Sequence, residues 1–172
     1  MNTRHLLLWA SLALTMPLAA QTPQEDFKRD ITLSGSNYVA YRGPQKQLTP
    51  APKGYKPFYL SHYGRHGSRF MIGKSAYDVP YFSLLKAKKE GKLTAKGEET
   101  LEKVKVIREE AKGRDGELTP LGALQHQGIT KRMMEKFPEI FAGNTNIEAR
   151  STVVIRCILS MENGLQQMLR MN

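Results

Sequence analysis

The feature that most constrains the fold is an apolar run that ends in a cluster of cationic side chains, Phe58-Tyr59-Leu60-Ser61-His62-Tyr63-Gly64-Arg65-His66-Gly67-Ser68-Arg69. From Tyr55 to Tyr63, aromatic and aliphatic residues have the density typical of a β-strand. Gly64 and Gly67 then allow the backbone to turn and to approach a ligand closely. The pattern predicts a strand with the Arg-His-Gly-x-Arg group just past its carboxyl end.

Two guanidiniums that flank one imidazole are suited to binding a phosphoryl group. Arg65 and Arg69 can bind phosphate oxygens bidentately and stay charged at any working pH. His66, when neutral, can attack phosphorus and form a phosphohistidine, which divides one difficult displacement into two easier ones. One ring nitrogen must then be free, with the N–H of the other held by a carbonyl or a carboxylate. The alternative interpretation is a solvated basic turn.

The first twenty residues differ from the rest of the chain. Overall, the 172 residues have ordinary globular composition, with 40% hydrophobic and 24% charged residues. In segment 1–20, Arg4 and His5 precede an apolar stretch, and small residues follow it up to Ala20. This pattern predicts a secretory signal peptide, because the apolar run is shorter than the roughly 20 residues that a membrane anchor needs. We therefore expect an exported protein, periplasmic or secreted, without a stable membrane anchor.

The formal net charge of +10 favours a polyanionic partner. Phosphorylated small molecules, nucleic acids and anionic lipids all fit that sign, and charge alone does not choose among them. Cys157 is the only cysteine, so no intrachain disulfide is expected. No Cys or His partner is spaced for a zinc site, so we predict no metal.

Apolar periodicity and capping residues predict four helices. One covers Ser75–Lys89 with Pro80 in its first turn, and a second starts after Thr94 and runs to Lys112. A third has Thr119 as its N-cap and runs to Phe137, and the fourth runs to Leu169. A buried face of the third helix is predicted from Leu121, Leu124, Met133 and Phe137.

Two further predictions concern residues next to these helices. Segment 146–154 is a second strand candidate, directly before the fourth helix. His126 lies within the third helix, where a lone histidine is interpreted as a packing or surface residue.

Three groups of residues resemble the motifs of the histidine acid phosphatase family, in particular its multiple inositol polyphosphate phosphatases and phytases. They are Arg-His-Gly-x-Arg at 65–69, Leu-Thr-Pro-x-Gly at 118–122 and Arg-Ser-Thr-x-x-x-Arg at 150–156. The resemblance implies that His66 is the catalytic nucleophile. It implies phosphate binding by Arg65, Arg69 and Arg156, and it places Arg150 at the pocket edge. Three guanidiniums would neutralise the phosphate, so neither a metal nor an organic cofactor is implied.

The sequence departs from the family pattern at two places. Many members have an aromatic or small residue and then Pro after the first motif, whereas this chain has Phe70-Met71-Ile72-Gly73. The family often carries Asp within the variable positions of the third motif, which are Val153, Val154 and Ile155 here. The path of the first loop and the charge around the third motif are therefore expected to differ.

The resemblance implies an α/β fold, namely the N-terminal portion of a doubly wound sheet domain of the phosphoglycerate-mutase-like type, with an α-helical insertion at about 75–115. Segment 21–172 would be the N-terminal part of that histidine phosphatase domain, with the C-terminal remainder absent. In the family, a later His-Ala-Glu or His-Asp motif supplies the proton donor. None of the four histidines precedes either sequence, so we expect no proton donor in this chain.

These observations predict an exported phosphomonoesterase that acts on inositol polyphosphates through a phosphohistidine. One alternative is a non-catalytic phosphate-binding module. Another is a basic nucleic-acid-binding protein, but that class interleaves aromatic and basic residues on one face. Here the cations gather beside a glycine turn, so we expect a phosphorylated small molecule and no nucleic acid as partner. Arg65, His66, Arg69 and Arg156 are expected to converge on one pocket.

Overall fold

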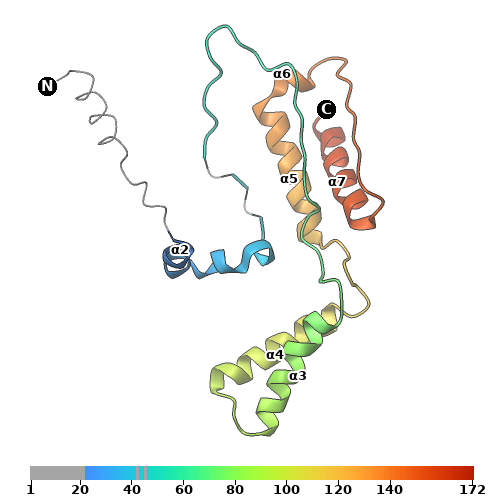
Figure 1. Cartoon of the computed structure of the whole chain (residues 1–172). Helices are drawn as coiled ribbons and strands as arrows, with labels where there is room; N and C mark the ends of the chain where they lie inside the picture. The colour runs from blue at the N-terminus through green and yellow to red at the C-terminus, as the bar shows by residue number, and fades with distance from the viewer. Residues whose placement is uncertain (1–21, 42, 45) are drawn as a thin grey trace, which may run out of the picture. The chain divides into compact units, whose positions relative to one another are not determined.

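The computed structural model describes residues 22–41, 43–44 and 46–172, and the predicted signal peptide 1–20 lies outside them. The chain divides into two compact units after Ala40. The first unit contains α2 (Pro23–Arg29) and the 3-10 helix η1 (Ile31–Tyr38). The second contains the helices drawn from green to red in Figure 1, which are α3 (Ser75–Lys89), α4 (Ala95–Glu110), α5 (Pro120–Lys136), α6 (Pro138–Phe141) and α7 (Ile155–Met171).

The predicted α/β fold is wrong, because the described residues form helices and no sheet. The only β pairing among them is an isolated antiparallel bridge between Arg69 and Leu118. The two strand candidates, 55–63 and 146–154, make backbone hydrogen bonds only to neighbouring turns in the described chain. The Tyr55 amide donates to the Pro52 carbonyl, and the Val154 carbonyl accepts from the Cys157 and Ile158 amides at the start of α7. Strand-favouring residues describe a fit to a half-buried pleated surface, and a strand also needs a neighbour for its backbone groups.

Helices α3 and α4 pack against each other as a hairpin. Thr94 caps α4 as predicted, since its side chain accepts a hydrogen bond from the Gly97 amide. The Arg108 Nε donates to Asp78 Oδ1 at 2.6 Å, and its guanidinium lies over the rings of Tyr81 and Phe82. One cation from α4 thus joins a carboxylate and two aromatic rings of α3.

Two predictions about helix interiors are wrong in detail. Pro80 lies inside α3 and not in its first turn. Leu121 and Leu124 of α5 are exposed, and the buried residues of that helix are Gly122 and Thr130. Apolar spacing marks a face that can be buried, but here the small residues face the neighbouring elements.

Helices α5 and α7 lie side by side and make the most extensive helix pair of the second unit (Figure 1). The backbones come close at Gly164, where an added Cβ would stand 3.0 Å from the Thr130 Oγ1. Gln127 Nε2 also donates to Asn163 Oδ1 at 2.9 Å. Small side chains and one amide pair therefore set the spacing between the two helices.

Two antiparallel segments, 69–71 and 116–118, connect the α3–α4 hairpin to the rest of the second unit, and we call this pair the neck. The Phe70 amide donates to the Glu117 carbonyl at 2.9 Å, and the Gly116 amide donates to the Met71 carbonyl at 3.1 Å. The neck includes the bridge between Arg69 and Leu118. It brings the two ends of the 70–117 segment together, directly beside the first predicted motif.

A search for membrane-spanning helices in the described ranges finds none that is long and apolar enough to cross a bilayer.

Candidate functional site

The loop at His66–Arg69 is held between α5 and α7 by hydrogen bonds to its backbone. The Gly67 amide donates to Ser160 Oγ of α7 at 3.1 Å, and the Ser68 amide donates to Gln125 Oε1 of α5 at 2.8 Å. The Ser68 carbonyl accepts from both the amide and the hydroxyl of Thr119, each at 2.9 Å. These two loop amides are occupied by the protein itself, so positive charge for a ligand must come from the side chains.

Two glycines allow this loop to lie directly on α5. A Cβ added at Gly67 would stand 2.6 Å from the Cα of Gly122, and one added at Gly122 would stand 2.8 Å from the Ser68 nitrogen. Both positions are buried. The first and second motifs are therefore in contact, backbone against backbone, although more than fifty residues separate them.

His66 has one ring nitrogen held by a backbone carbonyl. Its Nδ1 lies 2.9 Å from the Gly67 oxygen. A carbonyl oxygen can only accept, so Nδ1 carries the hydrogen in this bond. In the neutral imidazole, Nε2 then carries the lone pair. This is the tautomer that attack on phosphorus by Nε2 requires.

Arg69 and Arg156 each bury a guanidinium nitrogen that no described residue satisfies. The Nε atoms of both are buried without a hydrogen-bond partner, while Arg69 Nη1 donates to the Phe70 carbonyl at 2.8 Å. A Cβ added at Gly116 would stand 3.3 Å from Arg156 Nη1, so the guanidinium lies close to this glycine. The φ of Gly116, +70°, also favours glycine at this position. A buried charged donor without a partner is costly, and a bound anion would offset that cost.

Arg156 also lies at an unusual place in its helix. Helix α7 starts after Val154 without a side-chain cap, and its first turn contains no acidic residue. A cation in the first turn is unfavourable because the helix dipole is positive there. The amides of Ile155 and Arg156 donate to no group in the part of the chain that the structure describes. Helix amides and guanidinium together make this end of α7 favourable for an anion.

The other two predicted arginines are exposed. Arg65 follows the irregular segment before the loop, and its carbonyl accepts a hydrogen bond from His126 Nε2 at 3.1 Å. Arg150 Nε donates to Glu148 Oε1 at 2.8 Å, and its side chain is 85% exposed. A surface ion pair with Glu148 therefore describes the contacts of Arg150. Its role at a pocket edge stays a prediction.

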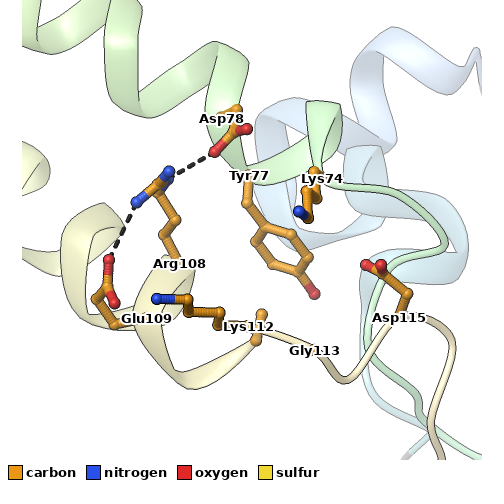
Figure 2. Close-up of a pocket in the computed structure, with 9 residues that line it drawn as sticks. Lys74, Tyr77, Asp78, Arg108, Glu109, Lys112, Gly113 and Asp115 are labelled. Carbon is orange, nitrogen blue, oxygen red and sulfur yellow. Dashed lines mark hydrogen bonds and ion pairs between the residues drawn. The ribbon is translucent and has the colours of Figure 1, made fainter.

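Two hollows in the described part of the chain are lined by other residues. One, of about 180 Å³, lies where α3 and α4 approach the neck, and its charged side chains include the Arg108 pair with Asp78 (Figure 2). The other, of about 380 Å³, lies between segment 57–62 and the end of α5. Neither contains the four predicted residues, so their convergence on one pocket stays a prediction. No group of three or more His, Cys, Asp or Glu that could hold a metal was found among the described residues.

Sequence reasoning assigned no part in the site to Gln125 and Ser160, which contact the loop, or to His126, which contacts Arg65 just before it and was interpreted as a packing or surface residue. The signal for Ser160 was its position one helical turn after Arg156, since a serine inside a helix often bonds to the carbonyl four residues earlier. Ser160 Oγ does donate to the Arg156 carbonyl, at 2.7 Å. Gln125 and His126 gave no such signal, because their partners lie about sixty residues away in the sequence.

Burial lowers the pKa of His126 below its ordinary value. The hydrogen bond to the Arg65 carbonyl opposes this shift, whereas the neighbouring rings of His62 and His66 add to it. A histidine whose pKa is lower in the folded chain takes up its proton more readily in the unfolded chain. His126 therefore contributes stability above about pH 6.5 that is lost as the pH falls below that value.

We expect His126→Gln to flatten this pH dependence. Urea denaturation at pH 7.5 and pH 5.5 should show a larger loss of stability on acidification in the parent protein than in the variant. The exposed His62 is the matched control: its ring makes only a lesser contribution to the His126 shift than burial does, so His62→Gln should change the slope less than His126→Gln does. Equal slopes for the parent and for His126→Gln would contradict the assignment.

No protein-family model matches this chain, and no curated protein matches it either. The family resemblance thus depends on the three motifs alone.

Proposed function

We propose that this chain is an exported phosphomonoesterase of the histidine acid phosphatase type, acting on inositol polyphosphates through a phosphohistidine at His66. The observation that carries the proposal is the pair of buried, unpartnered Nε atoms of Arg69 and Arg156. Both arginines belong to elements that hold the His66 loop, one within the loop and one in the first turn of α7. The exposed Arg65 is the third guanidinium. The basic, apolar pattern of segment 1–20 motivates the proposed export.

The proposed reaction has two displacements at phosphorus. First, the lone pair on His66 Nε2 forms an N–P bond while the ester P–O bond breaks, and the leaving oxygen keeps the electron pair. Next, a water oxygen attacks phosphorus, the N–P bond breaks, and the pair returns to the imidazole as the water loses a proton to solvent. The guanidiniums stabilise the charge on the equatorial oxygens in both steps.

The leaving group determines whether this chain can cleave the ester at a useful rate. An inositol alkoxide leaves poorly without a proton, and general acid catalysis contributes about 10² to 10⁴ in rate. No histidine of the sequence is followed by Ala-Glu or Asp, so no residue here is assigned to that proton transfer. This observation favours a second candidate function, a phosphate-binding module that does not turn over.

Binding experiments test the anion site itself. We expect Arg69→Gln and Arg156→Gln each to weaken binding of orthophosphate by about 10- to 100-fold, because each variant loses one or two hydrogen bonds to a charged group. The matched control is Arg170→Gln, since Arg170 lies exposed in the last turn of α7. Isothermal titration calorimetry measures the affinities.

The same titration tests the proposed substrate class. Inositol hexakisphosphate should bind more tightly than orthophosphate, and its affinity should fall more steeply with added salt, because exposed charges around the site are screened. Equal affinity for the two ligands would contradict a polyphosphorylated substrate. Unchanged orthophosphate affinity in both arginine variants would contradict the site.

A further inference from the structure

We propose that Ser160 is a positioning residue that couples the attacking imidazole of His66 to the first turn of α7, which carries Arg156. This inference rests on the proposed function, because it names what aligns the two groups of that site. It assigns a role to a residue outside the three motifs.

The Ser160 hydroxyl is buried and uses both of its hydrogen-bonding capacities. Ser160 is 2% exposed. Its Oγ donates to the Arg156 carbonyl at 2.7 Å and accepts from the Gly67 amide at 3.1 Å. A hydroxyl has one hydrogen, so the direction of both bonds follows. The hydroxyl is therefore a fixed link between the first turn of α7 and the loop.

The link extends to the His66 ring through one residue. The amide that Ser160 holds belongs to the peptide that follows His66, and the carbonyl of Gly67 accepts from His66 Nδ1. Gly67 is thus held by Ser160 at its nitrogen and holds the imidazole at its oxygen. Removing the Ser160 hydroxyl releases Gly67 at its nitrogen, so that only the bond from the Ser68 amide to Gln125 still holds the peptide group whose carbonyl selects the reactive tautomer of His66.

The depth of Ser160 in the structure is set by the α5–α7 contact. Gly164, one turn later on α7, lies against Thr130 of α5, and both residues are buried. Because α7 is packed against α5 one turn away, the position of the Ser160 hydroxyl relative to the loop is fixed by the helix that carries it. A small loss of alignment is expensive in rate, since a misplacement of about 1 Å can cost on the order of 10²-fold.

The test uses the full chain and three substitutions at Ser160. Ser160→Ala removes the hydroxyl, Ser160→Cys nearly keeps its volume with a weak hydrogen-bonding group, and Ser160→Thr keeps the hydroxyl. Ser83→Ala, at an exposed position in α3, is the matched control. Three readouts are taken on each variant. The first is amide hydrogen exchange of Gly67, and the second is the ¹⁵N chemical shifts of the His66 ring. The third compares the change in the rate of phosphorylation by nitrophenyl phosphate with the change in orthophosphate affinity.

We expect Ser160→Ala and Ser160→Cys to speed Gly67 exchange by about tenfold or more and to mix the His66 tautomers. Phosphorylation should slow by about 10- to 100-fold, with orthophosphate affinity changed by less than about threefold. Ser160→Thr should restore slow exchange and the single tautomer.

Other outcomes overturn the inference. Unchanged Gly67 exchange and tautomers in the Ala and Cys variants would show that Ser160 holds nothing at His66. Equal losses of phosphate affinity and of rate would show a general structural role. If the parent chain takes up no phosphate, the proposed function fails, while the exchange and ¹⁵N readouts still decide the role of Ser160.

Discussion

His66→Ala is expected to abolish the acid-labile phosphate that nitrophenyl phosphate leaves on the protein. Nitrophenolate departs without a proton, so this ester needs the nucleophile and the guanidiniums but no general acid. The parent chain should therefore show an acid-labile phosphate, detected by ³²P labelling and mass spectrometry. Without the Nε2 lone pair no N–P bond can form. The protein-bound label should then fall to the background that is measured without covalent labelling.

The control for this experiment is His62→Ala. His62 lies four residues earlier, is exposed and has no role in the proposed chemistry. Circular dichroism of each variant is used to check that its helices are intact. Label that persists in His66→Ala would assign the phosphate to another residue. A folded parent chain that binds phosphate but takes up no label would favour the non-catalytic binding module.

Gly122→Ala is expected to cause a large loss of stability. The added Cβ would overlap the Ser68 carbonyl oxygen and stand 2.8 Å from the Ser68 nitrogen. Neither neighbour is a flexible side chain, so α5 must move away from the loop. Overpacking of this kind costs about 1–3 kcal/mol, sometimes more, and we expect the upper end here. Urea denaturation followed by circular dichroism measures the change.

Gly128→Ala provides the comparison within the same helix. A Cβ there meets only the end of the Arg132 side chain, at 3.3 Å, which can shift. Alanine is favoured over glycine inside a helix by about 1 kcal/mol, so this variant should be unchanged or more stable. Gly122→Ala with parental stability would show that the loop does not lie on α5 as the structure has it.

The helices could be predicted because their signals are local. Thr94 and Thr119 accept hydrogen bonds from amides three residues later, and Pro120 occupies the first helical position, where its missing N–H costs nothing. The starts of α4 and α5 follow from such residues, whereas α3 has no side-chain cap and was predicted from its apolar spacing. Each signal acts within a few residues of the element that it defines.

The sheet was predicted from a signal that is not local. Phe58, 95% exposed, and Tyr63 lie in an apolar run of strand-like composition, yet the run has no strand beside it in the described chain. Composition shows that a segment can enter a sheet, but pairing depends on a second segment that no local pattern identifies. The same limit explains the misjudged α5 face, because contact at Gly122 depends on a loop more than fifty residues earlier.

The candidate site was accessible in part. Arginines and a histidine next to two glycines indicate anion chemistry from residue types alone, which is why Arg65, His66 and Arg69 were singled out. Arg156 was singled out only through the family resemblance. The groups that orient them were not, because Ser160 and Gln125 are ordinary polar residues until the fold brings them to the loop. Arg150 shows the converse, since a basic residue in a motif can still pair with a neighbour such as Glu148.

The neck at Arg69 and Leu118 makes the α3–α4 hairpin replaceable as a unit. Its two ends meet at one antiparallel bridge, so a hairpin of another length can be joined there without separating them. The groups proposed to act on phosphorus lie in the neck itself, before it, or on α7. A change in the length of the hairpin can therefore leave the proposed reacting groups in their places.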